Sequence, residues 1–565
     1  MNKLQTLDYA AIAIYMSLMA GIGVFLGKYI KNIGDYFKGG NAIPSISGAI
    51  SNFMTKFSTF IFVAYAGIAY SDGIIALTLI WSTVLPALVG VFFFAKRWRR
   101  AGIITPMEYL EVRFNAPVRQ IFSWGGVIFK ILDNMVRLYA LGLFLKAATD
   151  LSLESCILIC GVIVALYTVI GGLWAVVITD VVQFIILIVA TLILVPLTIN
   201  AAGGFQNIVN TIPDHFNWFN GAKGTPVFLM VYYVMILIKY SGNWTFIQRF
   251  YSVRDEKASQ KQAMLTALFF FIFPTIFLFP SLAARIIVPN LENPEMAYVS
   301  VCLELLPQGI MGLMIAAMFA ATMSVLSGEY NVTAGVLTKD IYQRLFNKNA
   351  TDKELLWVGR LMTFVLGAMI TLGALYVGGF GGAFEANKLF TGLFAIPMTI
   401  PLVLGIALKK PQPWGALGTL IAGVILGLLL NTNKAISWEM ATLIEIVGCT
   451  TIFLLSGVLG KTSKAYKERI SRFFLKLATP LREDEKPKED WGFQRSMNRL
   501  YAIALAVTGS LFMVMSIPSI TETSGMFSFG AGIVCTILAY MMWYLNKEKD
   551  KNKNQSELKK KYEPA

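Results

Sequence analysis

The chain has 565 residues, of which 56% are hydrophobic and only 14% are charged. Water-soluble domains carry about 25% charged residues, so this composition excludes an ordinary soluble protein and indicates a polytopic membrane protein. The net charge of +15 does not indicate nucleic-acid binding. The basic residues lie in short connections and tails between apolar runs, as the positive-inside rule predicts for cytoplasmic loops.

About fifteen apolar segments are long enough to cross a bilayer, for which ~20 residues suffice. They lie at 7–27, 45–70, 73–95, 119–147, 153–171, 173–201, 225–248, 262–289, 306–338, 355–378, 384–408, 414–431, 437–460, 497–517 and 525–545. An odd number of spans puts the termini on opposite sides, and alternate connections hold most of the lysines and arginines. We therefore expect a multi-pass protein of the cell membrane with its N-terminus outside and its C-terminus in the cytoplasm.

Two of these segments contain polar interruptions. Segment 45–70 carries Lys56 among serines, threonines and an asparagine, and in segment 225–248 Lys239 is followed by Tyr-Ser-Gly-Asn. A charge at bilayer depth is costly on a lipid-facing helix, whereas non-helical backbone is tolerated where it lines a cavity. Interrupted helices in corresponding places of two halves are typical of inverted-repeat transporters, with the solute site between them.

Other ionisable residues inside the predicted spans are candidate functional residues. Lys130, Asp133 and Arg137 share one helical face, and we favour a self-neutralising structural cluster for them. Glu329 lies in a span rich in small and hydroxyl residues, which explain close helix packing but not a carboxylate. Asp180 lies near the predicted cytoplasmic end of its span, where a snorkelling or capping role fits.

Signals for catalysis are sparse. The single histidine, His215, falls in a predicted outer loop, and the five cysteines lie in or at the ends of apolar segments without metal-ligand spacing. Carboxylates paired at a fixed spacing and a Gly-rich phosphate loop are both absent from the sequence. We therefore expect neither an enzyme nor a nucleic-acid partner, and no histidine relay for proton coupling.

Five motifs, in the same order, resemble segments of the sodium/solute symporter family, which includes the sodium–glucose cotransporters. They are GDYFKGGNAIPSISGA at 34–49, TPMEYLEVRF at 105–114, GGLWAVVITDVVQ at 171–183, NWTFIQRFYSVRDEKAS at 243–259 and the segment 324–342 that ends in TKDIY. The resemblance covers about residues 5–460. It implies an all-α transporter whose ten core helices form two inverted halves of five, with the first and sixth core helices broken.

The resemblance also implies a domain organisation. It consists of a peripheral N-terminal helix and cytoplasmic linker (1–44), a first inverted repeat (45–201), a second inverted repeat (225–408), two peripheral helices (409–460), a cytoplasmic amphipathic linker (461–495), two appended helices (496–546) and a charged cytoplasmic tail (547–565). Contact of the linker with the lipid surface is one expectation for its amphipathic pattern.

In the family, sodium is held by backbone carbonyls of the broken first core helix and by carbonyl and hydroxyl oxygens of the eighth. By motif position, the corresponding residues here are Met54, Phe57, Ala321 and Ser324, with Asp180 close to the ion. Such all-oxygen coordination suits a hard cation. The sequence departs from the family at Val325, where relatives usually have a second hydroxyl, and Ser327 could compensate from a different angle.

Lys56 lies between the two expected carbonyl ligands, where the family often has a neutral polar residue. Its ammonium could replace sodium electrostatically, which would give sodium-independent or proton-coupled transport. Alternatively, Glu329 or Asp180 neutralises Lys56 and sodium still binds, or Lys56 is only a structural partner. We therefore assign Lys56, Glu329 and Lys239 to a candidate coupling group.

The expected solute site is not that of a neutral sugar. The residues that grip galactose in a bacterial relative align with Ile61, Ile80, Asn243 and Phe270, and only Asn243 is polar. Each unpaired sugar hydroxyl would cost about 1–3 kcal/mol.

A different lining follows from the neighbouring residues. Trp81, Thr83 and Tyr240 could line a pocket with Ile61 and Asn243 around the ring of a solute. Lys56 and Lys239 would favour a solute that carries a carboxylate. We predict a symporter that imports a small polar solute (a sugar, sugar acid or amino acid) with sodium. A membrane sensor on the same fold is the alternative.

Overall fold

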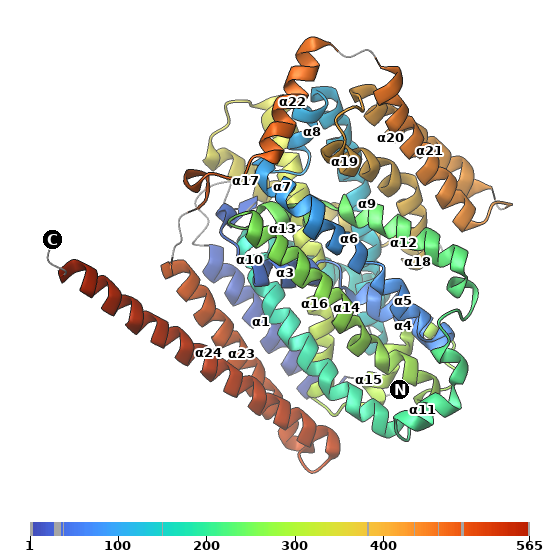
Figure 1. Cartoon of the computed structure of the whole chain (residues 1–565). Helices are drawn as coiled ribbons and strands as arrows, with labels where there is room; N and C mark the ends of the chain where they lie inside the picture. Colours follow the sequence, from blue (N-terminus) through green and yellow to red (C-terminus); the bar gives the residue numbers. More distant parts are fainter. Residues whose placement is uncertain are drawn as a thin grey trace.

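The computed structural model is a bundle of helices (Figure 1) and describes residues 4–27, 36–37, 39–149, 151–380, 383–433, 435–460, 463–487 and 491–562. Within these ranges the only β pairing is an isolated bridge between Ile43 and Val253. The first half contains α1 (Thr6–Gly27), α3 (Ser45–Met54), α4 (Ala66–Asp72), α5 (Ile75–Trp81), α6 (Val84–Val89), α7 (Ala95–Ala101), α8 (Glu108–Arg113), α9 (Ala116–Ala148), α10 (Leu153–Ala201) and α11 (Phe205–Thr211).

The second half and the C-terminal region continue in the same all-helical manner. They contain α12 (Pro226–Ser241), α13 (Trp244–Tyr251), α14 (Glu256–Ile287), α15 (Ala297–Leu305), α16 (Ile310–Val336), α17 (Asp352–Ala374), α18 (Ala383–Phe390), α19 (Ile396–Ala407), α20 (Pro413–Thr432), α21 (Trp438–Leu459), α22 (Lys464–Ala478), α23 (Trp491–Ser516) and α24 (Thr523–Tyr562).

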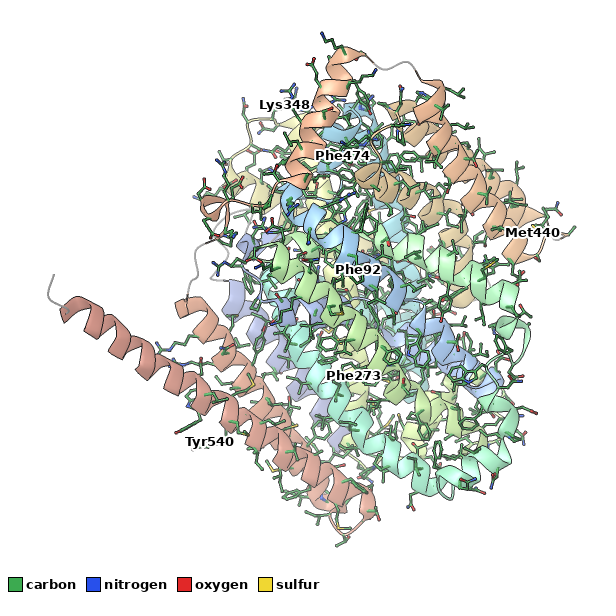
Figure 2. All side chains as sticks on the ribbon, in the orientation of Figure 1. Phe92, Phe273, Lys348, Met440, Phe474 and Tyr540 are labelled. Carbon is green, nitrogen blue, oxygen red and sulfur yellow. The ribbon has the colours of Figure 1, made fainter. Side chains whose placement is uncertain are left out.

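Nine helices in the described ranges are long and apolar enough to cross a membrane, or ten if the bent pair α12 and α13 counts as one span. Several predicted segments, among them 45–70 and 384–408, are divided into shorter helices in the structure. The outer surface is also apolar. Figure 2 labels Phe92, Met440 and Tyr540, whose side chains are 77%, 53% and 69% exposed, as expected for a face that contacts lipid.

Both predicted interruptions are present. Helix α3 ends at Met54, and after turn and non-helical backbone at 55–58 the chain continues into the π-helix η2 (Ile61–Tyr65) and α4. Such π-helical turns are frequent at functional sites. Helices α12 and α13 meet at an angle of 49°, and the side chain of Asn243 caps α13 by accepting hydrogen bonds from the Thr245 and Phe246 amides.

One predicted boundary is not a helix end. The sequence suggested separate spans at 153–171 and 173–201, but helical backbone runs continuously through α10, over 49 residues. At 1.5 Å per residue this helix is about 73 Å long if straight, well beyond the ~30 Å hydrocarbon core. Among the fully described residues of α10, the stretch Val176–Ala201 has the length and hydropathy of a full span.

Helix α16 lies at the centre of the bundle, and every one of its residues from Ile310 to Val336 is buried. Its N-terminus is capped from another helix. The Asp8 carboxylate in α1 accepts hydrogen bonds from the Gly309 and Gly312 amides, both at 2.7 Å. A Cβ at Gly312 would lie 2.4 Å from the Asp8 carbonyl oxygen, so only glycine permits this approach.

We expect Asp8→Ala to lower the free energy of unfolding by about 1–2 kcal/mol, because two amide donors at the end of α16 lose their acceptor. Thermal unfolding of the detergent-purified protein measures the loss. Asp8→Asn keeps a carbonyl acceptor and should lose less. An Asp8→Ala variant as stable as the wild type would show that this cap contributes nothing.

The linker helix α22 is amphipathic, as predicted, and its apolar side is packed on protein. Ile470, Phe473, Phe474 and Leu477 are buried, and Figure 1 shows α22 beside α7 and α8. Arg100 at the end of α7 donates hydrogen bonds to the carbonyls of Leu477 (3.0 Å) and Ala478 (2.8 Å). In the structure, the apolar face of α22 therefore contacts protein and not the lipid surface.

The last two helices form a hairpin at the edge of the bundle. Helices α23 and α24 pack against each other, both contact α10, and α23 also contacts α1 and α16. In Figure 1 α24 lies on the outside of the bundle, with its C-terminal end pointing away. Neither helix lines the cavity described below.

Candidate functional site

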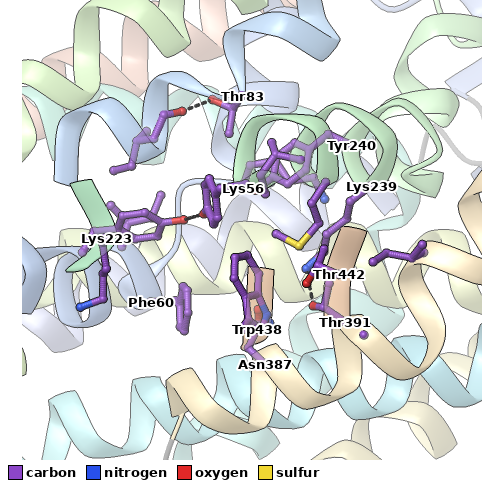
Figure 3. A pocket seen from close by; sticks show the side chains of 18 of the residues that line it. Lys56, Phe60, Thr83, Lys223, Lys239, Tyr240, Asn387, Thr391, Trp438 and Thr442 are labelled. Atoms are coloured by element: carbon purple, nitrogen blue, oxygen red, sulfur yellow. Dashed lines mark hydrogen bonds between the residues drawn. The ribbon is translucent and has the colours of Figure 1, made fainter. Parts of the chain in front are cut away.

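A cavity of about 350 Å³ lies between the two broken spans, within the size range of small-molecule sites. Figure 3 shows its walls. They include the first broken span (Lys56, Phe60, Ile61 and Tyr65), α12 (Tyr232, Lys239 and Tyr240), the end of α18 with the π-helix η9 (Thr391–Ala395) that follows it (Asn387 and Thr391), and α21 (Trp438 and Thr442). Thr83, Arg137 of α9, Phe270 of α14 and Ile396 of α19 also contribute. Lys223 and Glu439 line it at the side predicted to face outward.

Lys56 is 4% exposed and pairs with a carboxylate behind the cavity wall. Its ammonium lies 3.1 Å from Oε1 of Glu329 in α16, and the ammonium of Lys130 in α9 lies 2.8 Å from Oε2 of the same carboxylate. Of the two carboxylates considered from the sequence, Glu329 and not Asp180 therefore neutralises Lys56. Lys56 also lies over the rings of Tyr240 and Phe246, 5.5 and 5.8 Å from their centroids.

The cluster expected on α9 is divided. Asp133 pairs with Arg137 one turn along the helix, at 2.9 Å, and its other oxygen accepts from the Asn387 amide at 3.1 Å. Lys130 turns instead to Glu329. The expectation of a self-neutralising structural cluster is therefore wrong for Lys130, and Arg137 lines the cavity.

Lys239 has a different environment. Its ammonium donates a hydrogen bond to the Thr391 hydroxyl at 2.8 Å, as Figure 3 shows, and no carboxylate among the described residues lies within ion-pair distance. In the inner part of the cavity and directly behind its wall, the cations Lys56, Lys130, Arg137 and Lys239 thus face the two carboxylates Asp133 and Glu329, while Lys223 and Glu439 line the outer side. Two positive charges remain in excess inside the membrane, where uncompensated charge is costly.

The predicted solute residues fall in three places. Ile61, Thr83 and Tyr240 line the main cavity, and Asn243 lines a smaller adjoining one of about 30 Å³. Trp81 lies outside both linings. Its indole donates a hydrogen bond to the Phe271 carbonyl at 2.9 Å and stacks between Phe271 and Trp218.

Several cavity residues were not predicted. Phe60, Tyr65, Tyr232, Asn387, Thr391 and Trp438 all face it, and the hydroxyls of Tyr65 and Tyr232 are hydrogen bonded at 2.5 Å. Tyr65 and Phe60 lie in the interrupted span and were within reach of sequence reasoning. Trp438 was not, because α21 belongs to a segment expected to be peripheral.

The expected sodium ligands lie where the end of α3 meets α16. Met54, Phe57, Ala321 and Ser324 are each at most 1% exposed. The two segments are joined at Thr59, whose amide donates to the Thr322 hydroxyl at 2.9 Å and whose hydroxyl donates to the Met318 carbonyl at 2.9 Å. The break in the first span is therefore held directly against α16 at Met318 and Thr322.

The oxygen atoms present fit a cation. Ser324 Oγ and Asp180 Oδ1 are buried without a hydrogen-bond partner, although the two side chains are close enough to interact electrostatically. Val325 adds no oxygen, and the Ser327 hydroxyl donates to the Ser324 carbonyl at 3.1 Å. Two buried oxygens without a donor suit a hard cation.

Asp180 is fully buried and does not snorkel. Its Oδ2 accepts a short hydrogen bond from Ser51 in α3 and lies 3.9 Å from Arg249 of α13. Arg249 also donates to Ser51 at 3.1 Å. Asp180 thus connects α10 to both broken spans, and its second oxygen remains directed toward Ser324.

A cavity between two broken helices of a membrane-type bundle, with charged walls, is typical of a secondary active transporter. The match to known proteins makes the class specific. The model of the Sodium:solute symporter family matches residues 36–423, and the chain belongs to this family. The protein is therefore a multi-pass membrane symporter that couples solute movement to sodium.

Individual relatives are more distant. The chain is 27% identical to the sodium/sialic acid symporter NanT of Aliivibrio fischeri over 449 residues, covering 74% of this chain and 86% of the relative. It is 26% identical to the sodium/glucose cotransporter of Vibrio parahaemolyticus, covering 76% and 86%. A solved outward-open structure of a Na⁺-coupled sialic acid symporter superposes with a TM-score of 0.73 at 23% identity, covering 81% of this chain and 99% of that structure.

These matches confirm the predicted family and the fold class, an all-α transporter with a five-plus-five core. They also confirm the prediction of sodium-coupled solute symport. The relatives are transporters. The similarity to the solved structure, at 23% identity, concerns the fold alone.

Proposed function

We propose that the protein imports a small carboxylate-bearing solute, such as a sugar acid or an amino acid, together with sodium. The observation that supports this most strongly is the charge around the inner part of the cavity, where four cations face two carboxylates. An anionic solute supplies the missing counter-charge, and Lys239, which has only a hydroxyl partner, is the residue best placed to receive it. Two relatives are named for sialic acid, an acidic solute.

The other cavity walls suit a solute with a ring and some polar groups. Tyr65, Tyr232, Tyr240 and Trp438 present aromatic faces, while Asn387 and Thr391 provide amide and hydroxyl groups. Ile61 and Thr83 complete the predicted set inside this cavity. Asn243 caps α13 and acts on solute only through the smaller cavity, and we leave Trp81 out of the proposed site.

For sodium, we propose the carbonyl oxygens of Met54, Phe57 and Ala321 with the hydroxyl of Ser324, and Asp180 as the nearby negative charge. When bound, sodium would neutralise part of the carboxylate charge and fix the break of the first span against α16. The pairing of Lys56 with Glu329 favours this arrangement over a sodium-independent one, since the ammonium of Lys56 is already engaged at 3.1 Å.

The domain boundaries and the orientation stay proposals of the same kind. We propose two inverted repeats at 45–201 and 225–408, with the N-terminus outside and the C-terminus in the cytoplasm. The distribution of basic residues supports this orientation.

The solute proposal is tested by thermal stabilisation of the purified full-length protein, because a ligand of the folded state raises apparent stability. Matched pairs of solutes, glucuronate with glucose and sialic acid with N-acetylglucosamine, are added in sodium chloride or in choline chloride. We expect stabilisation by the acids and not by the neutral partners, and only with sodium. Stabilisation by the neutral sugars alone would refute the carboxylate proposal, and equal effects in choline would refute the sodium site.

A further inference from the structure

The carboxylate of Glu329 holds two ammonium groups at once. Lys56 approaches one oxygen at 3.1 Å and Lys130 the other at 2.8 Å, and side-chain exposure is 2%, 4% and 0% for Lys56, Lys130 and Glu329. Only Lys56 lines the main cavity, whereas Lys130 lines the smaller cavity behind it and Glu329 lines neither. An ammonium that faces the solute is thus bound from behind by an internal carboxylate.

This arrangement allows one partner to leave. If Lys56 moves away, Glu329 keeps Lys130 and is not left as a lone buried charge, which would cost several kcal/mol. Lys56 itself lies on the turn and non-helical backbone at 55–58, and its four-carbon stem gives the ammonium freedom to reorient. The nearby rings of Tyr240 and Phe246 provide a surface over which the charge remains stabilised during the move.

We infer that Glu329 is an internal substitute for the solute carboxylate: it neutralises Lys56 while the cavity is empty, and it yields Lys56 to an anionic solute while Lys130 retains it. This inference rests on the proposed function in one respect, that the solute is an anion. Glu329 then competes with the solute carboxylate for Lys56. The affinity for solute depends on the difference in free energy between the ion pair of Lys56 with the solute and its ion pair with Glu329.

The exchange has a consequence for the helices. The contact between Lys56 and Glu329 joins the break of the first span to α16, beside the contacts of Thr59 with Met318 and Thr322. When Lys56 turns to the solute, one of these ties is released, and the solute then takes part in holding the broken span. Arrival of an anion at the cavity therefore changes how the first span is attached to the central helix.

The test measures binding of three carboxylates (acetate, glucuronate and sialic acid) to the full-length protein in sodium chloride, by thermal stabilisation and by isothermal titration calorimetry. In E329Q the competitor is removed, and we expect binding about tenfold tighter than in the wild type, a change of 1.4 kcal/mol. In K130M, Glu329 depends on Lys56 alone, and we expect weaker binding, although Lys130 does not line the main cavity.

A double-mutant cycle separates this exchange from a general effect of charge. In a K56M background, E329Q should change the affinity little, because Lys56 is the group through which Glu329 acts. If E329Q tightens binding equally with and without Lys56, the effect is long-range electrostatics and the inference is wrong. E445Q is a control for substitution at a buried acidic side chain, since Glu445 in α21 is 2% exposed but lines neither cavity.

Two further outcomes are defined. If E329Q does not fold with Lys56 and Lys130 both unpaired, the double variant K130M/E329Q removes one of these charges and should also bind more tightly than K130M. If the wild type binds a carboxylate and E329Q binds it no better, the inference fails and the proposed function stands. If only glucose and N-acetylglucosamine bind, the proposed function fails first.

Discussion

Replacing Lys239 by methionine is expected to abolish uptake of a carboxylate solute while leaving the protein as stable as before or more so. Lys239 faces the cavity with a single hydroxyl partner, Thr391 at 2.8 Å, so it is a half-buried charge without a paired carboxylate, which an anionic solute can neutralise. Loss of a buried, hydrogen-bonded charge partner costs about 2–5 kcal/mol of binding, that is, roughly 30-fold or more. Removing an uncompensated charge from the membrane interior should raise the unfolding temperature.

Uptake of radiolabelled solute into proteoliposomes and thermal unfolding in detergent measure the two effects on one preparation. The carboxylate that gives the largest stabilisation of the wild type serves as the solute. Lys239→Arg keeps the charge and should retain part of the uptake, whereas Thr391→Val removes only the hydroxyl and should have a smaller effect. Full uptake by Lys239→Met would exclude Lys239 as the solute's counter-ion.

The second large effect is expected at Ser324. Since Val325 supplies no hydroxyl, Ser324 is the side-chain oxygen left for sodium on this part of α16, and its Oγ is buried without a hydrogen-bond partner. We expect Ser324→Ala to raise the sodium concentration for half-maximal uptake by about tenfold or more, because an oxygen ligand of a hard cation is lost. Only a small effect on stability is expected, because the Ser324 hydroxyl makes no hydrogen bond of good geometry within the protein and only approaches Asp180.

Uptake as a function of sodium concentration, at constant ionic strength with choline, measures this shift. Ser327→Ala is the matched control: its hydroxyl donates to the Ser324 carbonyl at 3.1 Å, so its loss should change sodium dependence much less. Val325→Ser restores the hydroxyl that relatives usually have and should lower the sodium requirement. An unchanged sodium dependence in Ser324→Ala would place the ion elsewhere.

The features that local sequence determines were predictable. The interruptions at 55–58 and at Gly242–Asn243 follow from polar and glycine residues that disfavour a continuous apolar helix, and both are present. Family motifs of the core likewise identified the class. Lys56 and Glu329 could also be singled out from the sequence, because a charged side chain inside a membrane span is costly and therefore marks a candidate functional residue.

What depends on packing between distant segments was not predictable. Lys130 shares a helical face with Asp133, yet it pairs with Glu329, about 200 positions away, because α16 presents a carboxylate at the right depth. Trp81 is of a residue type that often lines solute sites, but its helix is oriented so that its ring stacks on Phe271 and Trp218. Helix α21, which was expected to be peripheral, contributes Trp438 to the cavity. The pattern of apolar residues in α21 does not predict this contact.

The docking of α22 has a mechanical consequence for the transport cycle. This helix is attached on one side to α7 and the start of α14, through Arg100 and through the Leu481 amide, which donates to Glu256 at 2.7 Å. On the other side it is attached to the end of α8, where Arg469 donates to the Phe114 carbonyl. Any movement at this end that separates α7 and the start of α14 from α8 has to break one of these two sets of contacts, so the segment after the core limits how readily this end of the bundle opens.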